Sequence, residues 1–249
     1  MNRATSRSSL LIAGRILGLC CAVVTLGCGQ ASPEIDEPSA PAAEPAEGFV
    51  SLVGEDARKQ WVAYNGDEWP EGWDLAGGVL HCDGGGDLMT VRPYRDFELR
   101  FDWKVSPGGN SGVVYRAAPD GEKGWQSGPE YQVLDNAGHR DGKDPLTSAG
   151  SIYVLYPRGT DNSKPAGQWN SGAIVLEGNR LRHFLNGRES ASAEIGSDDW
   201  NRRVAASKFS AWPKFGTLSE GRIVLQDHGD EVWFRNVWIK EFPAPQAEQ

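Results

Sequence analysis

The clearest structural signal in the chain is a strict alternation of apolar and charged residues over positions 97–105. Every second residue from Phe97 to Val105 is apolar, and the residues between them are all charged. A period of two over this length predicts a β-strand with one buried side and one side facing solvent. The run ends at Pro107, which begins a Pro-Gly-Gly-Asn segment typical of a turn.

Shorter segments of the same kind follow through the rest of the chain and predict an all-β domain. Strands are expected at 79–82, 112–116, 130–134, 152–156, 173–176, 180–185, 189–193, 221–226 and 232–242. Asn186-Gly187 predicts a type I′ hairpin, because both central positions of that turn need a positive φ. One short helix is expected over 198–206, with Ser197 as its cap. Many antiparallel strands with a single helix predict a two-sheet antiparallel β-sandwich.

The first residues have the pattern of a secretory signal peptide. Three arginines and no acid accompany an apolar run over 16–26, which is too short to span a bilayer. Cys28 follows Leu-Gly, and this segment resembles the bacterial lipobox, in which such a cysteine is acylated and begins the mature protein. Thr25 stands where the lipobox usually has Leu, so a plain signal peptide cleaved near Gln30 is the alternative.

These patterns divide the chain into four segments. We expect a lipoprotein signal peptide over 1–27, a Pro/Ala/Glu tether over 28–48, the folded domain over 49–243 and a short tail over 244–249. The tether carries five acids and no base and cannot bury a core, as is typical of a disordered spacer. The protein is therefore predicted to be secreted across the inner membrane. An N-terminal lipid would anchor it to the cell envelope, on its periplasmic or its outer surface.

Charge and cysteine content exclude several classes of function. Removing residues 1–27 takes away three bases and no acid, so that 22 basic and 34 acidic residues remain. A strongly acidic chain is unsuited to nucleic acid, because phosphate binding needs the opposite field. Cys82 is the single cysteine of the expected domain, which excludes an internal disulfide and a cysteine-based metal site.

A set of ordered motifs resembles the 3-keto-disaccharide hydrolase domain family. The matching segments are Phe49-Val-Ser-Leu52, Asp96-Phe-Glu-Leu99, Gly108-Gly-Asn-Ser-Gly-Val113, Gly128-Pro-Glu-Tyr-Gln-Val-Leu-Asp-Asn136, Lys164-Pro-Ala-Gly-Gln-Trp-Asn170, Gly178-Asn-Arg180, His183-Phe-Leu-Asn-Gly187, Phe215-Gly216, Leu225-Gln-Asp-His-Gly-Asp230 and Val232-Trp-Phe-Arg-Asn-Val237. The resemblance implies a concanavalin-like jelly roll, similar to lectins and to laminarinase-type glycoside hydrolases. It also implies an oligosaccharide or glycoside substrate oxidised at C3 of a glucosyl unit.

The strand over 130–134 carries the strongest catalytic candidates. Alternation places Glu130 and Gln132 on one face, and a bulge after Val133 would return Asp135 to that face. Laminarinase-type enzymes use a similar layout of paired carboxylates as nucleophile and acid. An amide stands between the two acids here, and the alternative is that Glu130 and Asp135 only bind a ligand.

A second polar cluster follows the strand over 221–226. Gln226, Asp227, His228 and Asp230 suit an acid/base pair, an oriented imidazole or the ligands of a divalent metal. A polar turn in which Gly229 supplies the unusual dihedral is the alternative.

Four further residues are candidates for substrate binding. Asn110 offers an amide beside a glycine-rich turn, and Arg116 could donate a fork of hydrogen bonds, with a cross-strand salt bridge as its alternative. Lys164 and Trp169 lie in the loop after residue 156, where the indole could stack on a sugar ring.

The implied chemistry is removal of the C2 hydrogen beside the ketone, loss of the C1 oxygen and addition of water. The residues suggest Glu130 or His228 as base, Asp135 or Asp227 as acid, and Arg116 or a bound divalent metal at the ketone oxygen. Two other functions stay open on the sequence. One is a non-catalytic, lectin-like surface module, and the other is a glycoside hydrolase that uses Glu130 and Asp135 alone.

Overall fold

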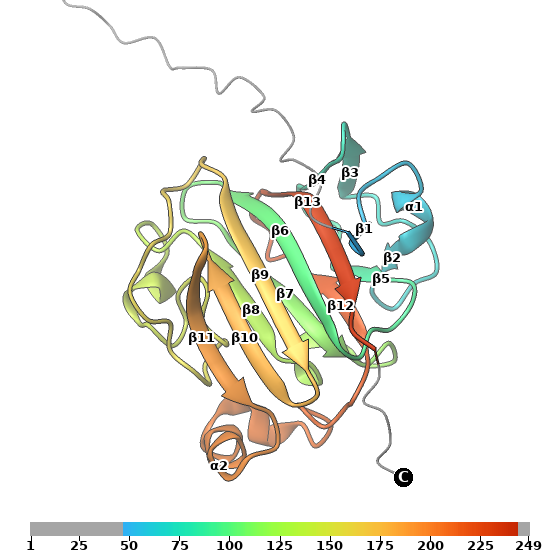
Figure 1. Cartoon of the computed structure of the whole chain (residues 1–249). Helices are drawn as coiled ribbons and strands as arrows, with labels where there is room; N and C mark the ends of the chain where they lie inside the picture. Colours follow the sequence, from blue (N-terminus) through green and yellow to red (C-terminus); the bar gives the residue numbers. More distant parts are fainter. Residues whose placement is uncertain (1–46, 244–249) are drawn as a thin grey trace, which may run out of the picture. The chain divides into compact units, whose positions relative to one another are not determined.

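A computed structural model describes residues 47–243, and these residues form two packed antiparallel sheets (Figure 1). The expected all-β sandwich is therefore confirmed. The signal peptide, Cys28, nearly all of the tether and the C-terminal tail lie outside the described residues. Among the residues described, no helix is both long and apolar enough to cross a bilayer.

The larger sheet has eight strands. Its order is β11 (Arg188–Glu194), β10 (Arg180–Leu185), β9 (Asn170–Glu177), β6 (Phe97–Val105), β13 (Val232–Glu241), β4 (Val79–Cys82) and β3 (Trp73–Ala76), and β1 (Val50–Ser51) pairs with β13. The alternating segment is β6, at the centre of this sheet, and its five apolar residues are all buried. The predicted hairpin joins β10 to β11, and Asn186 and Gly187 both have positive φ.

The smaller sheet has five strands and lies behind the larger one in Figure 1. Its order is β2 (Trp61–Ala63), β5 (Leu88–Thr90), β12 (Arg222–Leu225), β7 (Asn110–Ala117) and β8 (Glu130–Leu134). The core between the sheets holds large aromatic side chains, among them Trp61, Trp73, Trp103, Tyr115, Tyr131 and Phe234. Cys82 is buried in this core as well.

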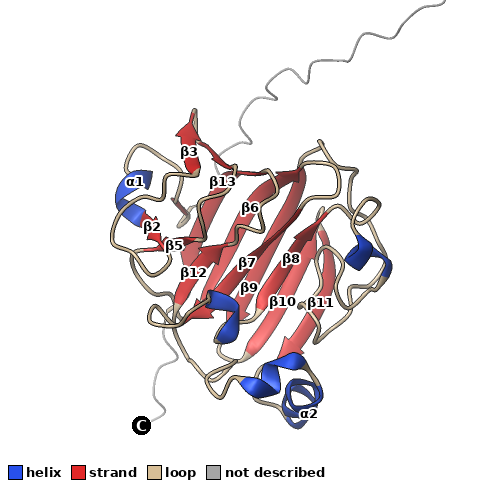
Figure 2. Cartoon of the chain, turned by 180° about the vertical axis from the view of Figure 1, so that it is seen from behind, coloured by secondary structure: helices blue, strands red, loops and turns tan. Residues whose placement is uncertain are grey.

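The outer face of the smaller sheet is itself partly covered. Met89, Val114 and Val224 form a second apolar cluster there, and Trp125 packs against it. Trp125 belongs to η1 (Gly124–Gln126), one of the short helices visible from behind in Figure 2. The segment η1 therefore shields part of this outer face from water.

The helical segments differ in part from expectation. The predicted helix is confirmed as α2 (Asp198–Ala206), and the Ser197 side chain accepts a hydrogen bond from the Trp200 amide. It is followed by η3 (Lys208–Ala211), while η2 (Arg140–Lys143) lies after β8. The structure also contains α1 (Ala57–Gln60), a single turn that the sequence pattern does not indicate.

The strand expected at 152–156 is wrong. Ile152 and Tyr156 form isolated bridges with a turn between them, and Val154 takes a φ of 66° that no strand allows.

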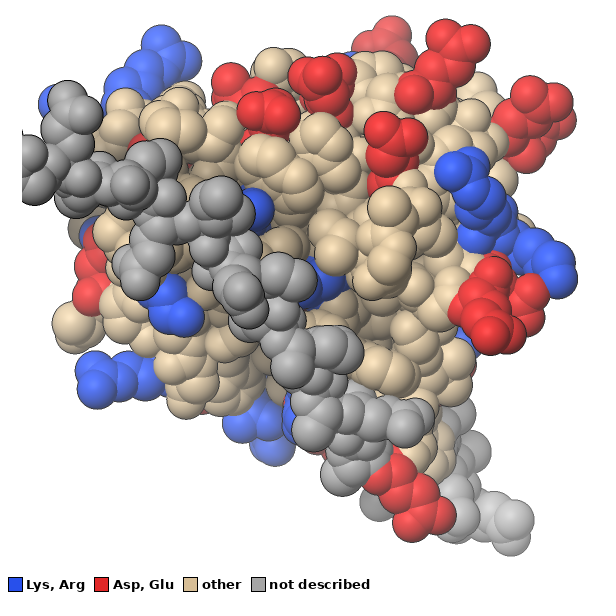
Figure 3. All heavy atoms as spheres, turned by 90° about the horizontal axis from the view of Figure 1, so that it is seen from above, with Lys and Arg blue, Asp and Glu red and all other residues tan. Residues whose placement is uncertain are grey.

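Viewed from above, acidic and basic side chains are both spread around the edge of the visible face (Figure 3).

Candidate active site

Glu130 lies on the outer face of the smaller sheet, where it begins β8. It pairs with Val114 of β7, and only 6% of its surface is exposed. Gln226, directly after β12, donates a hydrogen bond from Nε2 to Glu130 Oε2 at 3.3 Å. No cation lies within ion-pair distance of this carboxyl group in the described part of the chain.

Gly112 makes the approach of these two side chains possible. It lies on β7 opposite Gln132, and a Cβ at this position would collide with Gln226 Oε1 and Glu130 Oε1. The last glycine of the 108–112 segment therefore leaves room for two neighbouring side chains.

Burial determines the protonation of Glu130. Removal from water raises the pKa of its carboxyl group to about 8, although Lys208 and the Gln226 hydrogen bond both act to lower it. At neutral pH the group is therefore mainly protonated. A carboxylic acid held neutral at pH 7 can donate a proton to a reacting atom.

Gln226 also connects Glu130 to His228. Its Oε1 lies 3.3 Å from His228 Nε2, and an amide oxygen can only accept, so the proton of the neutral ring is on Nε2. Desolvation lowers the pKa of His228, although Asp87, Asp227 and Asp230 act to raise it. The imidazole is therefore neutral at pH 7, and Nδ1 keeps a lone pair that can take up a proton.

Asp87, directly before β5, supports the segment that carries His228. It is 7% exposed, and its Oδ1 accepts a hydrogen bond of 2.9 Å from the Asp227 amide. Burial raises the pKa of the Asp87 carboxyl group, while Lys123 and His228 act to lower it. Asp87 therefore positions the backbone from which His228 projects.

Gln132 and Asn110 form a second polar pair beside Glu130. Gln132 donates from Nε2 to Asn110 Oδ1 at 3.2 Å, and the backbone N–H of Asn110 donates to the Asp230 carboxylate. Gln132 is 1% exposed, and its Oε1 has no hydrogen-bond partner among the described residues. An unsatisfied buried acceptor is costly, and the hydroxyl group of a ligand would satisfy it.

Sequence reasoning missed three residues near Glu130. They are Lys208 and the two aromatic residues that its ammonium group contacts, Tyr153 and Trp125. Lys208 Nζ lies 4.8 Å from the centre of the Trp125 ring and 4.7 Å from that of Tyr153. Partial burial lowers the pKa of Lys208, and Glu130 acts to raise it. Burial raises the pKa of Tyr153 to about 12, so its phenol stays protonated. No motif marks these positions, because they come from η1, η3 and the turn at Tyr153, which only the fold brings together.

Asp135 does not face Glu130 as expected. The β7–β8 pairing runs without a register shift from Asn110 to Val114, so the predicted bulge is wrong. The Asp135 carboxylate accepts hydrogen bonds from the Gly108 and Ala137 amides and holds a turn together.

Asp227 and Arg116 are also engaged elsewhere. The Asp227 carboxylate accepts from the Gly86 and Gly229 amides, which matches the polar-turn alternative. Arg116 is 4% exposed, and its guanidinium donates to the Gly178 and Arg95 carbonyls and lies 3.5 Å from Asp96. Its φ of 50° at an irregularity of the β7–β12 pairing turns this side chain into the protein.

Lys164 and Trp169 lie on the other side of the sandwich. The Trp169 ring lies under the Arg235 guanidinium, at 4.1 Å, and under Lys104 at 5.1 Å, and both cations belong to the outer face of the larger sheet. Lys164 donates to the Trp169 carbonyl. The two residues are therefore not brought together with Glu130, and the expectation that they bind substrate stays a prediction.

No metal-binding cluster is found within residues 47–243. No group of three or more His, Cys, Asp or Glu side chains there has an arrangement that could hold an ion. The Gln226–Asp230 segment spreads its polar groups among backbone amides and a side-chain amide rather than around one point. The donor set thus does not fit the divalent metal that the sequence left open.

Comparison with known proteins identifies the family. Residues 48–240 match the model of the 3-keto-alpha-glucoside-1,2-lyase-like domain. A 3-keto-disaccharide hydrolase of Bacteroides thetaiotaomicron is 35% identical over 228 residues, which cover 78% of this chain and 79% of the relative. The chain belongs to this family. The resemblance noted in the sequence motifs is therefore confirmed, and membership assigns the chain to the carbohydrate hydrolases as a broad class.

Solved structures agree with the family assignment. A protein of Parabacteroides distasonis, provisionally assigned as a glycosyl hydrolase, has a TM-score of 0.74 and 32% identity over 80% of this chain and 96% of its own. A second protein of that organism, with the same provisional assignment, has a TM-score of 0.65 and 26% identity over 78% of this chain and 99% of its own.

Proposed function

We propose that the protein cleaves glycosides whose sugar carries a ketone at C3, by elimination followed by hydration. The observation that carries this proposal is the hydrogen-bonded series Glu130–Gln226–His228, in which Gln226 links a buried, protonated carboxyl group to an exposed, neutral imidazole. The names of the family and of the B. thetaiotaomicron relative support the same substrate class.

The ketone determines which groups the reaction needs. A C3 carbonyl acidifies the hydrogen at C2, so that a base of moderate strength can remove it and form an enolate. The C1–oxygen bond then breaks as an acid protonates the departing oxygen. One acid, one base and one group that stabilises negative charge at O3 are sufficient.

The geometry suggests one assignment of roles. His228 Nδ1 removes the C2 proton, and Glu130 gives its proton to the departing C1 oxygen. The Lys208 ammonium faces the same space and stabilises the enolate oxygen, a role that the sequence had suggested for Arg116. In the hydration step Glu130 takes a proton from water, whose oxygen bonds to C1, and His228 returns its proton to C2. Both groups end in the state in which they began.

Neighbouring residues supply substrate contacts. Gln132 Oε1 can accept a sugar hydroxyl, and Asn110 holds the Gln132 amide in position. Trp125 is partly exposed beside Lys208 and offers an aromatic surface to a sugar ring.

A glycoside hydrolase that uses two carboxylates is less compatible with the structure. It would need Asp135 on the same face as Glu130, and the Asp135 carboxylate instead binds the amides of its own turn. A carboxylate held by two backbone amides is a poor candidate for a nucleophile.

The decisive experiment compares a 3-keto-glucoside with the same glucoside before oxidation. The purified protein should release the leaving group only from the keto sugar, and EDTA should not change the rate. With deuterium at C2, release should slow several-fold if proton removal limits the rate, and the product should lose deuterium to the extent that protonated His228 exchanges with water. Cleavage of the unoxidised sugar at an equal rate would refute the keto requirement, and failure of the enzyme to hydrate the separately prepared 1,2-unsaturated ketone would refute the elimination.

We also propose that the chain is lipid-anchored to the cell envelope through Cys28, with the acidic segment over 29–48 as a spacer. Cys28→Ser should release the protein from the membrane fraction into the soluble fraction. Continued sedimentation of this variant with membranes would contradict the anchor.

A further inference from the structure

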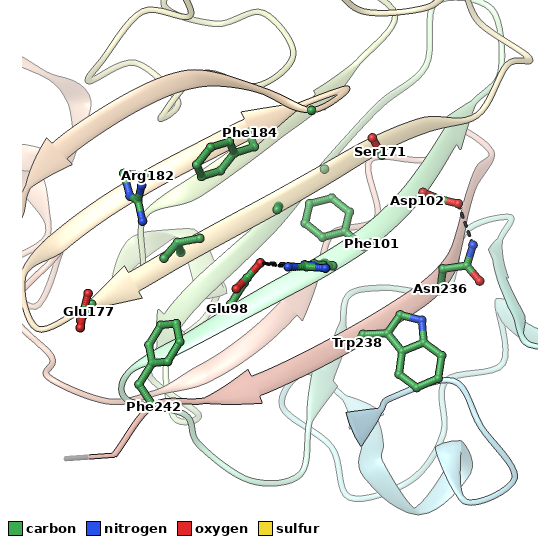
Figure 4. Close-up of a pocket in the computed structure, with 15 residues that line it drawn as sticks. Glu98, Phe101, Asp102, Ser171, Glu177, Arg182, Phe184, Asn236, Trp238 and Phe242 are labelled. Carbon is green, nitrogen blue, oxygen red and sulfur yellow. Dashed lines mark hydrogen bonds and ion pairs between the residues drawn. The ribbon is translucent and has the colours of Figure 1, made fainter. Parts of the chain in front are cut away.

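The outer face of the larger sheet contains a hollow of about 600 Å³, on the opposite side of the sandwich from Glu130. Its walls come from β10, β9, β6 and β13 and from Phe242 just after β13, as Figure 4 shows. Four adjacent strands span about 14 Å, since neighbouring strands lie about 4.8 Å apart. The hollow is thus long enough for more than one sugar ring and has the volume of an ordinary ligand pocket.

Aromatic rings and polar groups alternate along this hollow. Phe184, Trp238 and Phe242 present rings to it, and Ser171 and Asn236 lie among them. A pyranose ring has the matching surface, because its C–H faces are apolar and its edge carries hydroxyl groups.

The charges lining the hollow nearly cancel. Three carboxyl groups and two guanidinium groups line it, and Arg100 binds Glu98 with both Nε and Nη2 at 2.7 Å. Asp102 accepts hydrogen bonds from Arg235 at 3.2 Å and from Asn236 at 2.7 Å. A site of this kind gives no strong attraction to a phosphate, a metal ion or a highly charged peptide, and it suits a neutral ligand with many hydroxyl groups.

Two features of β13 shape the polar part of this hollow, and one of them leaves a donor available to such a ligand. The β6–β13 pairing is irregular between Arg235 and Trp238, and Asn236 in this bulge takes a φ of 51° that directs its amide to Asp102. Trp238 Nε1 is buried and has no hydrogen-bond partner among the described residues. A buried indole N–H without an acceptor favours a ligand that brings a hydroxyl oxygen.

We propose that this hollow is a second carbohydrate site, which binds a neutral oligosaccharide without cleaving it. None of the residues around Glu130 lines it, and no acid in it is held next to a neutral histidine. Binding there would keep the protein on a glycan chain while the opposite sheet carries out the reaction.

Calorimetric titration of the purified chain with maltohexaose, cellohexaose and laminarihexaose tests the proposal. At least one of these neutral hexasaccharides should bind. Trp238→Ala and Arg182→Ala should each weaken binding about tenfold. Ala173→Trp, which places an indole in the middle of the hollow, should abolish it. Arg188→Ala, an exposed arginine of β11 outside the hollow, is the matched control and should bind like the parent.

Turnover of a 3-keto-glucoside by the same variants separates the two sites. All four variants should keep it within about twofold, because no substituted residue contacts the Glu130 site. Circular dichroism and the melting temperature show whether each variant is folded. If Trp238→Ala fails to fold, the proposal is tested by Arg182→Ala at an exposed strand position and by Ala173→Trp at a partly exposed one.

Three results would overturn the proposal. The first is no binding of any of the three hexasaccharides. The second is binding that Gln132→Ala abolishes and Ala173→Trp leaves unchanged, which would place the ligand at the Glu130 site. The third is a dimer of the parent chain that Ala173→Trp dissociates without any glycan affinity, which would make this face an interface between two copies.

Discussion

The two outer faces of the sandwich carry the same kinds of side chain in different surroundings. On the larger sheet, Glu98 and Asp102 lie in an open hollow and bind guanidinium groups. On the smaller sheet, Glu130 is buried under η1 and nearby loops, with an amide as its hydrogen-bond partner. Water and a paired cation stabilise the charge of the first two acids, and the third lacks both. Its pKa is raised to about 8 in consequence.

This difference indicates how one scaffold can hold a binding surface and a reaction centre. Outward-facing polar residues are present on both sheets, and the smaller sheet also carries the apolar cluster of Met89, Val114 and Val224 on its outer face. Covering the Glu130 side of this face with Trp125, Tyr153 and Lys208 removes water and raises the proton affinity of the enclosed acid, while His228 stays exposed. Enclosure, more than residue type, distinguishes the candidate active site.

The largest expected effect follows from exchanging one acid on each face. Glu130→Gln should lower kcat for a 3-keto-glucoside about a thousandfold, because the amide cannot donate the proton to the leaving oxygen. Glu98→Gln, the matched control on the other sheet, should stay within about twofold. Equal losses in the two variants, measured by leaving-group release, would break the comparison.

The same pair of faces should differ in how stability depends on pH. The pKa of Glu130 is about 8 in the folded protein, against 4.5 for an exposed glutamate, so the folded state holds the proton more tightly. Its contribution to stability is fully present below about pH 4.5 and is lost as the pH rises through about 8.

Glu130→Gln mimics the protonated acid and should keep that contribution at high pH. Its free energy of unfolding should exceed that of the parent by on the order of 4 kcal/mol at pH 8.5, and by only about 1 kcal/mol at pH 5. Urea denaturation at the two pH values measures the gap. A gap that does not change between them would show that Glu130 is not desolvated.

Two glycines sharpen the comparison further. Gly112→Ala should lower kcat about tenfold, because the new Cβ separates Glu130 from Gln226. Gly172→Ala, in β9, would collide with the Phe101 ring and should lower the melting temperature while leaving kcat per folded molecule unchanged. Loss of kcat in both variants, or in neither, would contradict this assignment.

The smallest effect is expected for the exposed ion pair of the larger sheet. Glu98→Gln should change the free energy of unfolding by less than about 1 kcal/mol at pH 7, because solvent screens the Glu98–Arg100 pair. Chemical denaturation in low and high salt measures it. A cost of several kcal/mol would mean that the face is covered in solution.

The sequence pattern predicts the long strands well and the shortest ones unevenly. β6, β8, β10 and α2 have the predicted bounds, because each shows a full period of two or a capped helical turn. Among the strands of three or four residues, β4 was predicted with its bounds, and β2, β3 and β5 were missed, because so short a run contains too little of a period to be recognised reliably. The run over 152–156 is apolar enough for a strand, and the left-handed Val154 depends on tertiary packing.

The site was predicted in part, for a related reason. Glu130 with Gln132, and Gln226 with His228, stand close together in the sequence and could be recognised as two clusters. Their meeting across Gly112 depends on the pairing of β8, β7 and β12. Lys208 joins them from η3 far along the chain, and alternation gives no indication of such a contact. Asp135, Asp227 and Arg116 were predicted for the site and do not reach it. The two carboxylates accept hydrogen bonds from backbone amides in turns, and the guanidinium group donates to backbone carbonyls inside the protein.

The place of β13 has a consequence for the order of synthesis. This strand is the last one made, yet it lies inside the larger sheet, where it pairs with β6 on one side and with β4 and β1 on the other. A chain still attached to the ribosome leaves β6 and β4 unjoined, and the larger sheet cannot close until residue 241 has emerged. Closure of the larger sheet is therefore a late event in synthesis, and β6 and β4 stay without their shared partner until then.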